Sequence, residues 1–252
     1  MILYEYPFNE RLRTYLRLEQ LFHRLGELIP RTHSVDHHFA LLTIFEIMDV
    51  AARADLKTDV LKDLDKQKIL FDSYRGNPSI SEKLLDGFIS QLEGCFADLN
   101  GQPGKTGQSL SEDEWLMGIR GRIGIPGGTC SFDLPGYHAW RNMPSDRRRR
   151  DLEDWAGTLA PLAESVLLLL RLMRDSGMPQ KVVTTRGQFQ QTLPPNGRTF
   201  NLLRLRIDPS LQLIPEISGN RLLVSVRLMQ QDESGKLLPA MEDASFELTL
   251  CT

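Results

Sequence analysis

The chain has 252 residues, of which 41% are hydrophobic and 25% are charged, close to the average of globular proteins. This length fits one large domain or two ordinary ones and allows a sizeable core, which excludes wholesale disorder. The formal net charge of −3 argues against a general nucleic-acid-binding protein but allows local patches of either sign.

The first 100 residues predict four amphipathic helices joined by short connections. Apolar residues recur at helical spacing after four residues that favour a helix start, namely Asn9, Ser34, Asp55 and Ser81. The Gly-Asn-Pro sequence at 76–78 ends the third helix. Four such helices favour an antiparallel bundle.

The middle of the chain predicts a turn-rich segment followed by a long helix. Residues 100–108 are rich in Gly and Pro and predict a loop. The sequence IPGGTCSFDLP at 125–135 excludes a regular helix and predicts an ordered turn in which Cys130 and Phe132 pack inward. A helix over residues 145–176 follows, with Ser145 as its cap.

The last third changes pattern and predicts β-structure. Residues 181–185 are β-branched, and three later segments alternate apolar and polar residues, at 200–207, 222–228 and 245–250. Turn residues separate these segments, at 194–197, 218–220 and 232–235. We expect about five strands in an antiparallel sheet or small sandwich.

The fold class is therefore predicted to be α+β, with an N-terminal helical domain at residues 1–178 and a β-rich domain at residues 179–252. The helix over 145–176 is placed to pack on both domains. The three cysteines are far apart and form no CxxC pair, which indicates free thiols in a reducing compartment. The start of the chain does not resemble a signal peptide and no apolar stretch is long enough to span a bilayer, so we expect a cytoplasmic protein without a membrane partner.

Candidate chemistry is sparse, and we expect no enzyme, no cofactor and no metal site. His33, His37 and His38 are interpreted as exposed histidines, because no third ligand stands at a suitable spacing. Cys130 near His138 has the residue types of a thiol nucleophile and its base, but no local protease signature surrounds it. A structural turn is the favoured interpretation.

Basic residues gather in two places. Four consecutive arginines at 147–150 are flanked by Asp146 and Asp151, and on a helix they point all round the axis. We expect a solvated face there, with contact to an acidic partner as the alternative. The second set lies in the β-rich part and comprises Lys181, Arg186, Arg198, Arg204, Arg206, Arg221 and Arg227.

The second set has two open interpretations. Asp208 and Glu216 are the acids among these residues, so the set forms either a polar face of the sheet or a docking groove for an acidic peptide. Arginine suits the second role because its planar fork binds carboxylates bidentately. Arg204 and Arg206 would share one face of a strand.

Several segments, in order, resemble the ZapD family of bacterial cell-division proteins. They are YEYPFNER at 4–11, RTYLRLE at 13–19, DLDKQ at 63–67, IPGG at 125–128, CSFDLP at 130–135, PEISG at 215–219 and FEL at 246–248. The resemblance runs from about residue 3 to residue 251, nearly the whole chain.

The resemblance implies a helical domain joined to a β domain, a homodimer and no catalysis. It also implies binding to the acidic C-terminal tail of the tubulin-like protein FtsZ and crosslinking of FtsZ filaments at the mid-cell division ring. Arg17 and His138 match a basic central pocket proposed for the dimer, although Glu114 stands where some relatives have a basic residue. A second proposed tail-binding surface matches the β-domain residues, and we favour it: Lys181, Arg204, Arg206, Arg221 and Arg227.

The alternative class is a nucleic-acid-associated protein that uses the arginine-rich β domain. Such a sheet normally presents aromatic side chains on which bases stack, and the basic segments here lack them. Nucleic acid is therefore not the expected partner.

Overall fold

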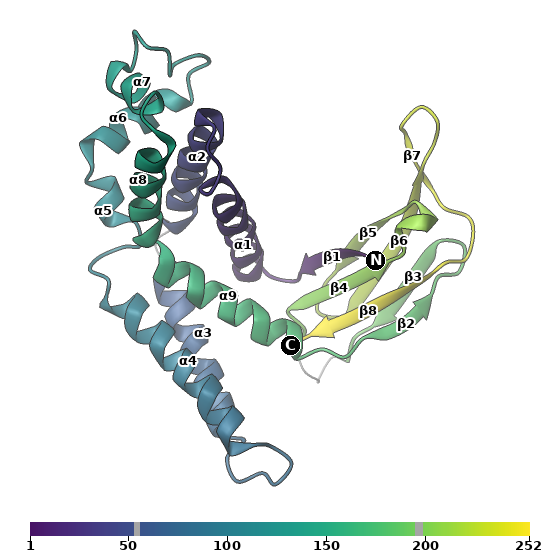
Figure 1. Cartoon of the computed structure of the whole chain (residues 1–252). Helices are drawn as coiled ribbons and strands as arrows, with labels where there is room; N and C mark the ends of the chain where they lie inside the picture. Colours follow the sequence, from purple (N-terminus) through teal and green to yellow (C-terminus); the bar gives the residue numbers. More distant parts are fainter. Residues whose placement is uncertain (53–55, 195–198) are drawn as a thin grey trace. The chain divides into compact units, whose positions relative to one another are not determined.

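The computed structural model describes residues 1–52, 56–194 and 199–252 and confirms the α+β class: after one N-terminal strand the helices come first, and the other strands follow them (Figure 1). The predicted helix start at Asp55, most of the predicted turn at 194–197 and Arg198 lie outside the described residues. The chain divides into two compact units. We call residues 16–169 the helical unit and residues 1–15 with 170–252 the β unit.

The helices of the described chain carry the labels of Figure 1. They are α1 Glu10–Leu28, α2 Ser34–Ala51, α3 Leu56–Asp72, α4 Glu82–Gly101, α5 Gln108–Ser111, α6 Glu114–Ile123, α7 Pro135–Arg141, α8 Ser145–Gly157 and α9 Ala160–Asp175. Within the helical unit, α3 pairs with α4, whereas α2 packs on α7 and α8.

Local capping explains where the first helices begin. The Asn9 side chain accepts a hydrogen bond of 2.8 Å from the Leu12 backbone N–H, which confirms the predicted N-cap. The second helix is capped by His33, whose Nδ1 accepts from the Val35 N–H at 3.2 Å. The predicted cap at Ser34 is wrong by one residue, because Ser34 is already the first residue of the helix.

The predicted helix over residues 145–176 is broken in two. The axes of α8 and α9 differ by 64°. Gly157 has low helix propensity, and Pro161 lacks the amide hydrogen that a continuous helix needs. The Thr158 hydroxyl donates to the Trp155 carbonyl oxygen at 2.8 Å and occupies an acceptor at the end of α8.

In the part of the chain that the structure describes, no single helix has the length and apolar character of a transmembrane span, although α8 and α9 reach them as a bent pair.

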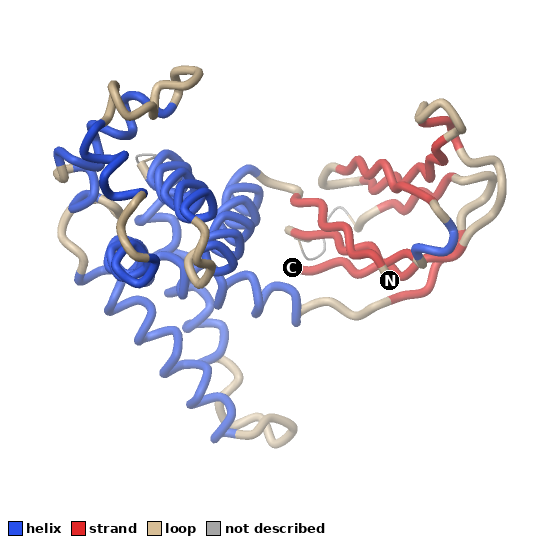
Figure 2. Tube along the Cα trace, turned by 45° about the horizontal axis from the view of Figure 1, so that its top comes forward, coloured by secondary structure: helices blue, strands red, loops and turns tan. Residues whose placement is uncertain are grey.

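The strands form two four-stranded antiparallel sheets. They are β1 Ile2–Pro7, β2 Gln180–Val183, β3 Gln188–Thr192, β4 Leu202–Ile207, β5 Leu213–Gly219, β6 Leu223–Gln231, β7 Leu237–Pro239 and β8 Ser245–Cys251. Sheet A has the order β1-β4-β8-β2; in sheet B, β6 lies between β5 on one side and β3 and β7 on the other. The sheets lie face to face as a small sandwich (Figure 2), with a core of Leu, Ile, Val and Phe side chains from both.

Four of these strands were not among the segments predicted from the sequence. The strand β1 lies in the stretch assigned to the helical domain, but it pairs with β4 from Ile2–Ile207 to Pro7–Leu202 and belongs to sheet A. The strand β3 is polar apart from Phe189, and β5 contains Pro215, a residue that is rare inside strands. The sequence signal for these strands is therefore weak, and their place depends on pairing with distant segments.

Candidate functional site

The outer face of sheet A holds a mostly buried ion cluster. Leu203, Leu205 and Ile207 of β4 point into the core, so Arg204 and Arg206 between them share the outer face, as predicted. Arg204 Nε donates to Glu5 Oε1 at 3.0 Å, and Arg174 at the end of α9 donates to both oxygens of Glu5, at 2.9 and 2.7 Å.

This cluster uses Arg204 internally. Each of the three side chains is at most one-fifth exposed, at 15% for Glu5, 19% for Arg204 and 20% for Arg174. An ion pair removed from water to this extent is costly to break, because separation leaves a charge without a partner. Arg204 and Arg174, through Glu5, therefore connect β4, β1 and the last turn of α9 within the β unit.

Farther along the same face, two cations flank one carboxylate. Arg206 and Lys181 both lie in register with Glu247 of β8, from opposite sides. The Arg206 Nη1 lies 3.3 Å from Glu247 Oε1, and both side chains are partly exposed. Glu247 is therefore already engaged by Arg206 and also lies beside Lys181.

The outer face of sheet B is different. Val226 and Leu228 of β6 are fully buried, so Arg227 between them points outward, across from Gln188 on β3 and Glu216 on β5. Arg221 is exposed in the turn that joins β5 to β6. Among the described residues, neither Arg221 nor Arg227 forms an ion pair.

The predicted arginine cluster is thus divided between two surfaces. Arg204 and Arg206 lie on the outer side of sheet A, whereas Arg227 lies on the outer side of sheet B, with the core between them. Alternation along a strand predicts that Arg204 and Arg206 share a face. The sequence alone does not show that β4, which carries these two residues, and β6, which carries Arg227, belong to different sheets. One peptide lying flat on one face cannot contact all four arginines.

The two residues of the predicted central pocket lie in the helical unit. Arg17 is exposed on α1 and His138 is exposed on α7, where its Nε2 lies 3.4 Å from Asn142 Nδ2. No hydrogen bond or ion pair joins the two side chains in the described part of the helical unit. Contact of Arg17 and His138 with a partner stays a prediction.

The arginine run at 147–150 is not simply a solvated face. Arg148 is 5% exposed, and its guanidinium donates to the carbonyl oxygens of Thr32 (2.7 Å), Arg141 (3.2 Å) and Met143. Its Nε donates to His37 Nδ1 at 2.9 Å. The prediction is wrong for this arginine, because its side chain turns toward the start of α2 and closes the end of α7.

Two of the three histidines depart from the prediction of exposed side chains, whereas His33 is exposed as predicted. His37 is fully buried, with its Nε2 2.6 Å from the Arg31 carbonyl oxygen, and His38 is half-buried, with its Nδ1 2.5 Å from the Tyr137 hydroxyl. Burial lowers the pKa of both His37 and His38, and the cations Arg148 and Arg141 respectively act in the same direction. Burial also raises the pKa of Tyr137 to about 12.

The turn at 125–135 is ordered but faces outward. Cys130 is exposed and the Phe132 side chain is 82% exposed, so the prediction that both pack inward is wrong. Successive turns hold the backbone, and Arg122 lies 3.5 Å from Asp133. The backbone hydrogen bonds form within the turn itself. A turn motif in the sequence therefore does not show whether its side chains are buried or exposed.

Chemistry-bearing groups are few in the described chain. Burial raises the pKa of the Cys95 and Cys251 thiols, which disfavours the reactive thiolate. Residues 1–52, 56–194 and 199–252 contain no group of three or more His, Cys, Asp or Glu side chains that could hold a metal ion.

Comparison with known proteins shows which family the chain resembles. The profile described as "ZapD: Cell division protein" matches residues 16–227. The chain is 49% identical over all of its 252 residues to the cell division protein ZapD of Ralstonia pickettii, of which it covers 99%. It is 48% identical, with the same coverage, to the cell division protein ZapD of Ralstonia nicotianae.

Proposed function

Because this chain belongs to the ZapD family of cell division proteins, we propose that it binds the acidic C-terminal tail of FtsZ and crosslinks FtsZ filaments at the division ring. It acts by binding in the cytoplasm and catalyses no reaction. The observation that carries the proposal is the outer face of sheet B, where Arg221 and Arg227 are exposed and have no ion-pair partner among the described residues.

The chemistry of this face suits an extended acidic peptide. Arg221 and Arg227 are six residues apart along the β5–β6 hairpin, and a strand rises about 3.3 Å per residue, so the two arginines are spaced for a peptide lying along β6. Between them lie Leu223 and Ser225, which offer an apolar contact and a hydroxyl group. Arginine forms charge-assisted hydrogen bonds with carboxylates, worth about 1.5–3 kcal/mol each where water is partly excluded.

The other predicted contacts are ranked below this face. Arg206 is paired with Glu247, and Arg204 is paired with Glu5, so each of these arginines would exchange an existing partner for a new one. Lys181 lies in register with Glu247, beside that pair. Arg17 and His138 are exposed and form the alternative site in the helical unit. They are the next surface to test if sheet B does not bind.

Crosslinking requires two binding sites, and we propose that a homodimer supplies them. A two-fold dimer presents the same surface twice, and many weak contacts along a polymer then gain from avidity. The helical unit exposes several large apolar side chains that an interface would cover: Phe39, Ile69, Leu84 and Phe132. Light scattering should give twice the chain mass of 28.7 kDa; a strict monomer at micromolar concentration would contradict this part of the proposal.

The direct test is sedimentation of polymerised FtsZ with and without the protein. We expect more FtsZ in a low-speed pellet when the protein is present, and the protein in the same pellet. The effect should fade as salt rises, because the screening length falls to about 3 Å at 1 M salt. Unchanged FtsZ sedimentation at low salt, with a folded dimer, would refute the proposal.

A further inference from the structure

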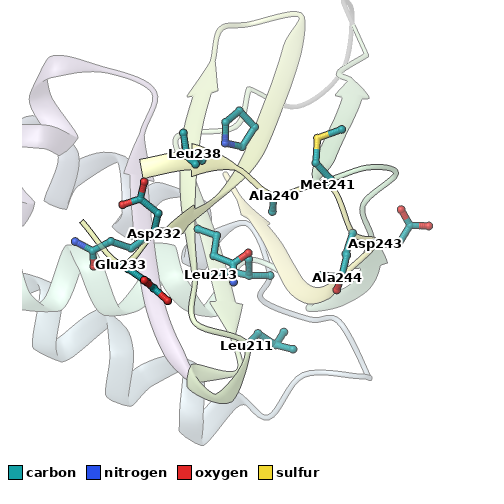
Figure 3. A pocket seen from close by; sticks show the side chains of 13 residues that line it. Leu211, Leu213, Asp232, Glu233, Leu238, Ala240, Met241, Asp243 and Ala244 are labelled. Carbon is teal, nitrogen blue, oxygen red and sulfur yellow. The ribbon is translucent and has the colours of Figure 1, made fainter. Parts of the chain in front are cut away.

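The β sandwich has a cavity at the end where the chain crosses between its two sheets (Figure 3). Residues 208–212 lead from β4 to β5, and residues 240–244 lead from β7 to β8, so each segment passes from one sheet to the other. The cavity lies between these two crossings and has a volume of about 560 Å³. It belongs entirely to the β unit.

The floor of the cavity is a continuation of the sandwich core. Leu213, Gln230 and Leu238 lie in one register row on β5, β6 and β7. This row follows Leu228 and Val226 on the same side of β6, and those two residues are fully buried against sheet A. Sheet A ends before the row is reached, because β4 stops at Ile207 and β8 begins only at Ser245.

At this end of the sandwich, apolar side chains of the row and of the two crossing segments therefore have no strand of sheet A over them. Leu238 is 43% exposed, Leu211 is 40% exposed and Met241 is 72% exposed, all on the cavity wall. Methionine adapts its shape to different apolar partners, which suits a binding surface. A bulky apolar side chain that entered the cavity would extend the core by one layer.

The rim of the cavity is acidic. Asp232, Glu233, Glu242 and Asp243 line it, and none of its lining residues is Lys, Arg or His. Asp232 and Asp243 each use one oxygen to accept backbone N–H groups, from Ser234 and Arg186, and so are held in place. Hydrogen bonds from Ser234 and from the Lys236 backbone lower the pKa of Asp232 and so favour its charged form.

The two glutamates are free to engage a partner. Glu233 and Glu242 are exposed and form no ion pair with any residue that the structure describes. The combination of an apolar floor and an acidic rim repels the acidic tail assigned to sheet B. It also disfavours an anionic lipid surface. It matches a peptide that carries apolar anchors next to lysine or arginine.

We propose that this cavity is a second docking site, which takes a basic, amphipathic peptide segment of a partner protein. An apolar side chain fills the space over Leu213 and Leu238, and flanking cations contact Glu233 and Glu242. The site is independent of the FtsZ proposal, since it differs in location and in charge from the outer face of sheet B. A protein that bundles filaments could thereby hold a second partner at the same place.

The test uses the full-length protein and a fluorescein-labelled 12-residue peptide in which leucines alternate with lysines and arginines. Two companion peptides replace all the leucines by serine, or all the basic residues by glutamate. We expect anisotropy to show binding of the first peptide, with affinity at least about tenfold lower for each companion, because both kinds of contact are needed. Labelling of methionine methyl groups with ¹³C should show a shift of the Met241 signal on binding.

The decisive variant is Glu233→Lys with Glu242→Lys, and its matched control is Glu153→Lys with Asp154→Lys, which makes the same charge change on exposed residues of α8. The cavity variant should lose at least about tenfold in affinity, while the control stays close to wild type. Equal loss in both pairs would show a general charge effect and overturn the proposal. A Met241 signal that moves with protein concentration alone would instead assign the cavity to a second copy of the chain, and would also overturn it.

Discussion

The arginines at 147–150 and the arginines of sheet B differ in how their density in the sequence relates to their exposure in the structure. The run at 147–150 is the densest basic segment of the chain, yet Arg148 is buried and bonded to three carbonyl oxygens and His37. Arg221 and Arg227 are separated in sequence, yet they are exposed and without an ion-pair partner in the described residues. A run of like charges therefore did not mark the surface that is open to a partner. An arginine is buried or open to a partner according to the hydrogen-bond acceptors that surround its guanidinium group.

The largest expected effect of this comparison is on stability. Arg148→Ala would leave three carbonyl groups and the His37 Nδ1 without their donor in a buried site, so we expect unfolding to become easier by about 3–5 kcal/mol. Arg147→Ala is the matched control. Its side chain is 59% exposed and, among the described residues, pairs only with Asp151, a contact worth about 0–1 kcal/mol. Urea denaturation of both variants measures the difference, and equal stabilities would show that the buried contacts of Arg148 carry little free energy.

The second prediction compares the contributions to stability of two carboxylates on the outer face of sheet A, Glu5 and Glu247. Glu5→Gln removes the charge that holds Arg204 and Arg174, and we expect a loss of about 2–3 kcal/mol because both guanidinium groups are mostly buried. Glu247→Gln removes the partner of the more exposed Arg206 and should cost at most about 1 kcal/mol. Thermal denaturation should rank the two variants in this order. The reverse order would mean that Arg204 is available to a partner after all.

Those two contrasts also show what could be predicted from the sequence. Helical periodicity and the cap at Asn9 located the first helix, and alternation located β4, β6 and β8, because these signals act over a few neighbouring residues. The strand β1 depends on pairing with β4, about 200 residues away in sequence. The residues of β1 themselves carry no pattern that predicts this pairing. Glu5 acquires its partners in the same way. Residue types indicated arginine as the binding residue, but only the topology separates Arg204 from Arg227.

A smaller effect concerns pH. Burial lowers the pKa of His37 below its ordinary value, so the folded state favours the neutral ring that accepts from Arg148. Protons then bind the unfolded chain more readily, and this contribution to stability is present above the unfolded pKa of about 6.5 and is lost as pH falls through the folded pKa. His38 acts in the same direction.

We therefore expect a lower free energy of unfolding at pH 5.5 than at pH 7.5, and a smaller difference in His37→Gln than in wild type. Urea titrations at the two pH values give the comparison. If His37→Gln keeps the whole wild-type difference in free energy of unfolding between the two pH values, that difference arises from other groups.

The proposed binding of FtsZ depends on one surface, the outer face of sheet B, and one measurement tests that surface directly. The measurement is co-sedimentation with FtsZ filaments of two charge-reversal proteins, Arg221→Glu with Arg227→Glu on sheet B, and Lys181→Glu with Arg206→Glu on sheet A. Both pairs change the charge equally, and both proteins must first show wild-type unfolding and wild-type mass by light scattering. We predict that the sheet B pair no longer pellets with FtsZ, while the sheet A pair retains most of its binding. Wild-type pelleting of the sheet B pair would contradict the account and direct attention to Arg17 and His138 in the helical unit.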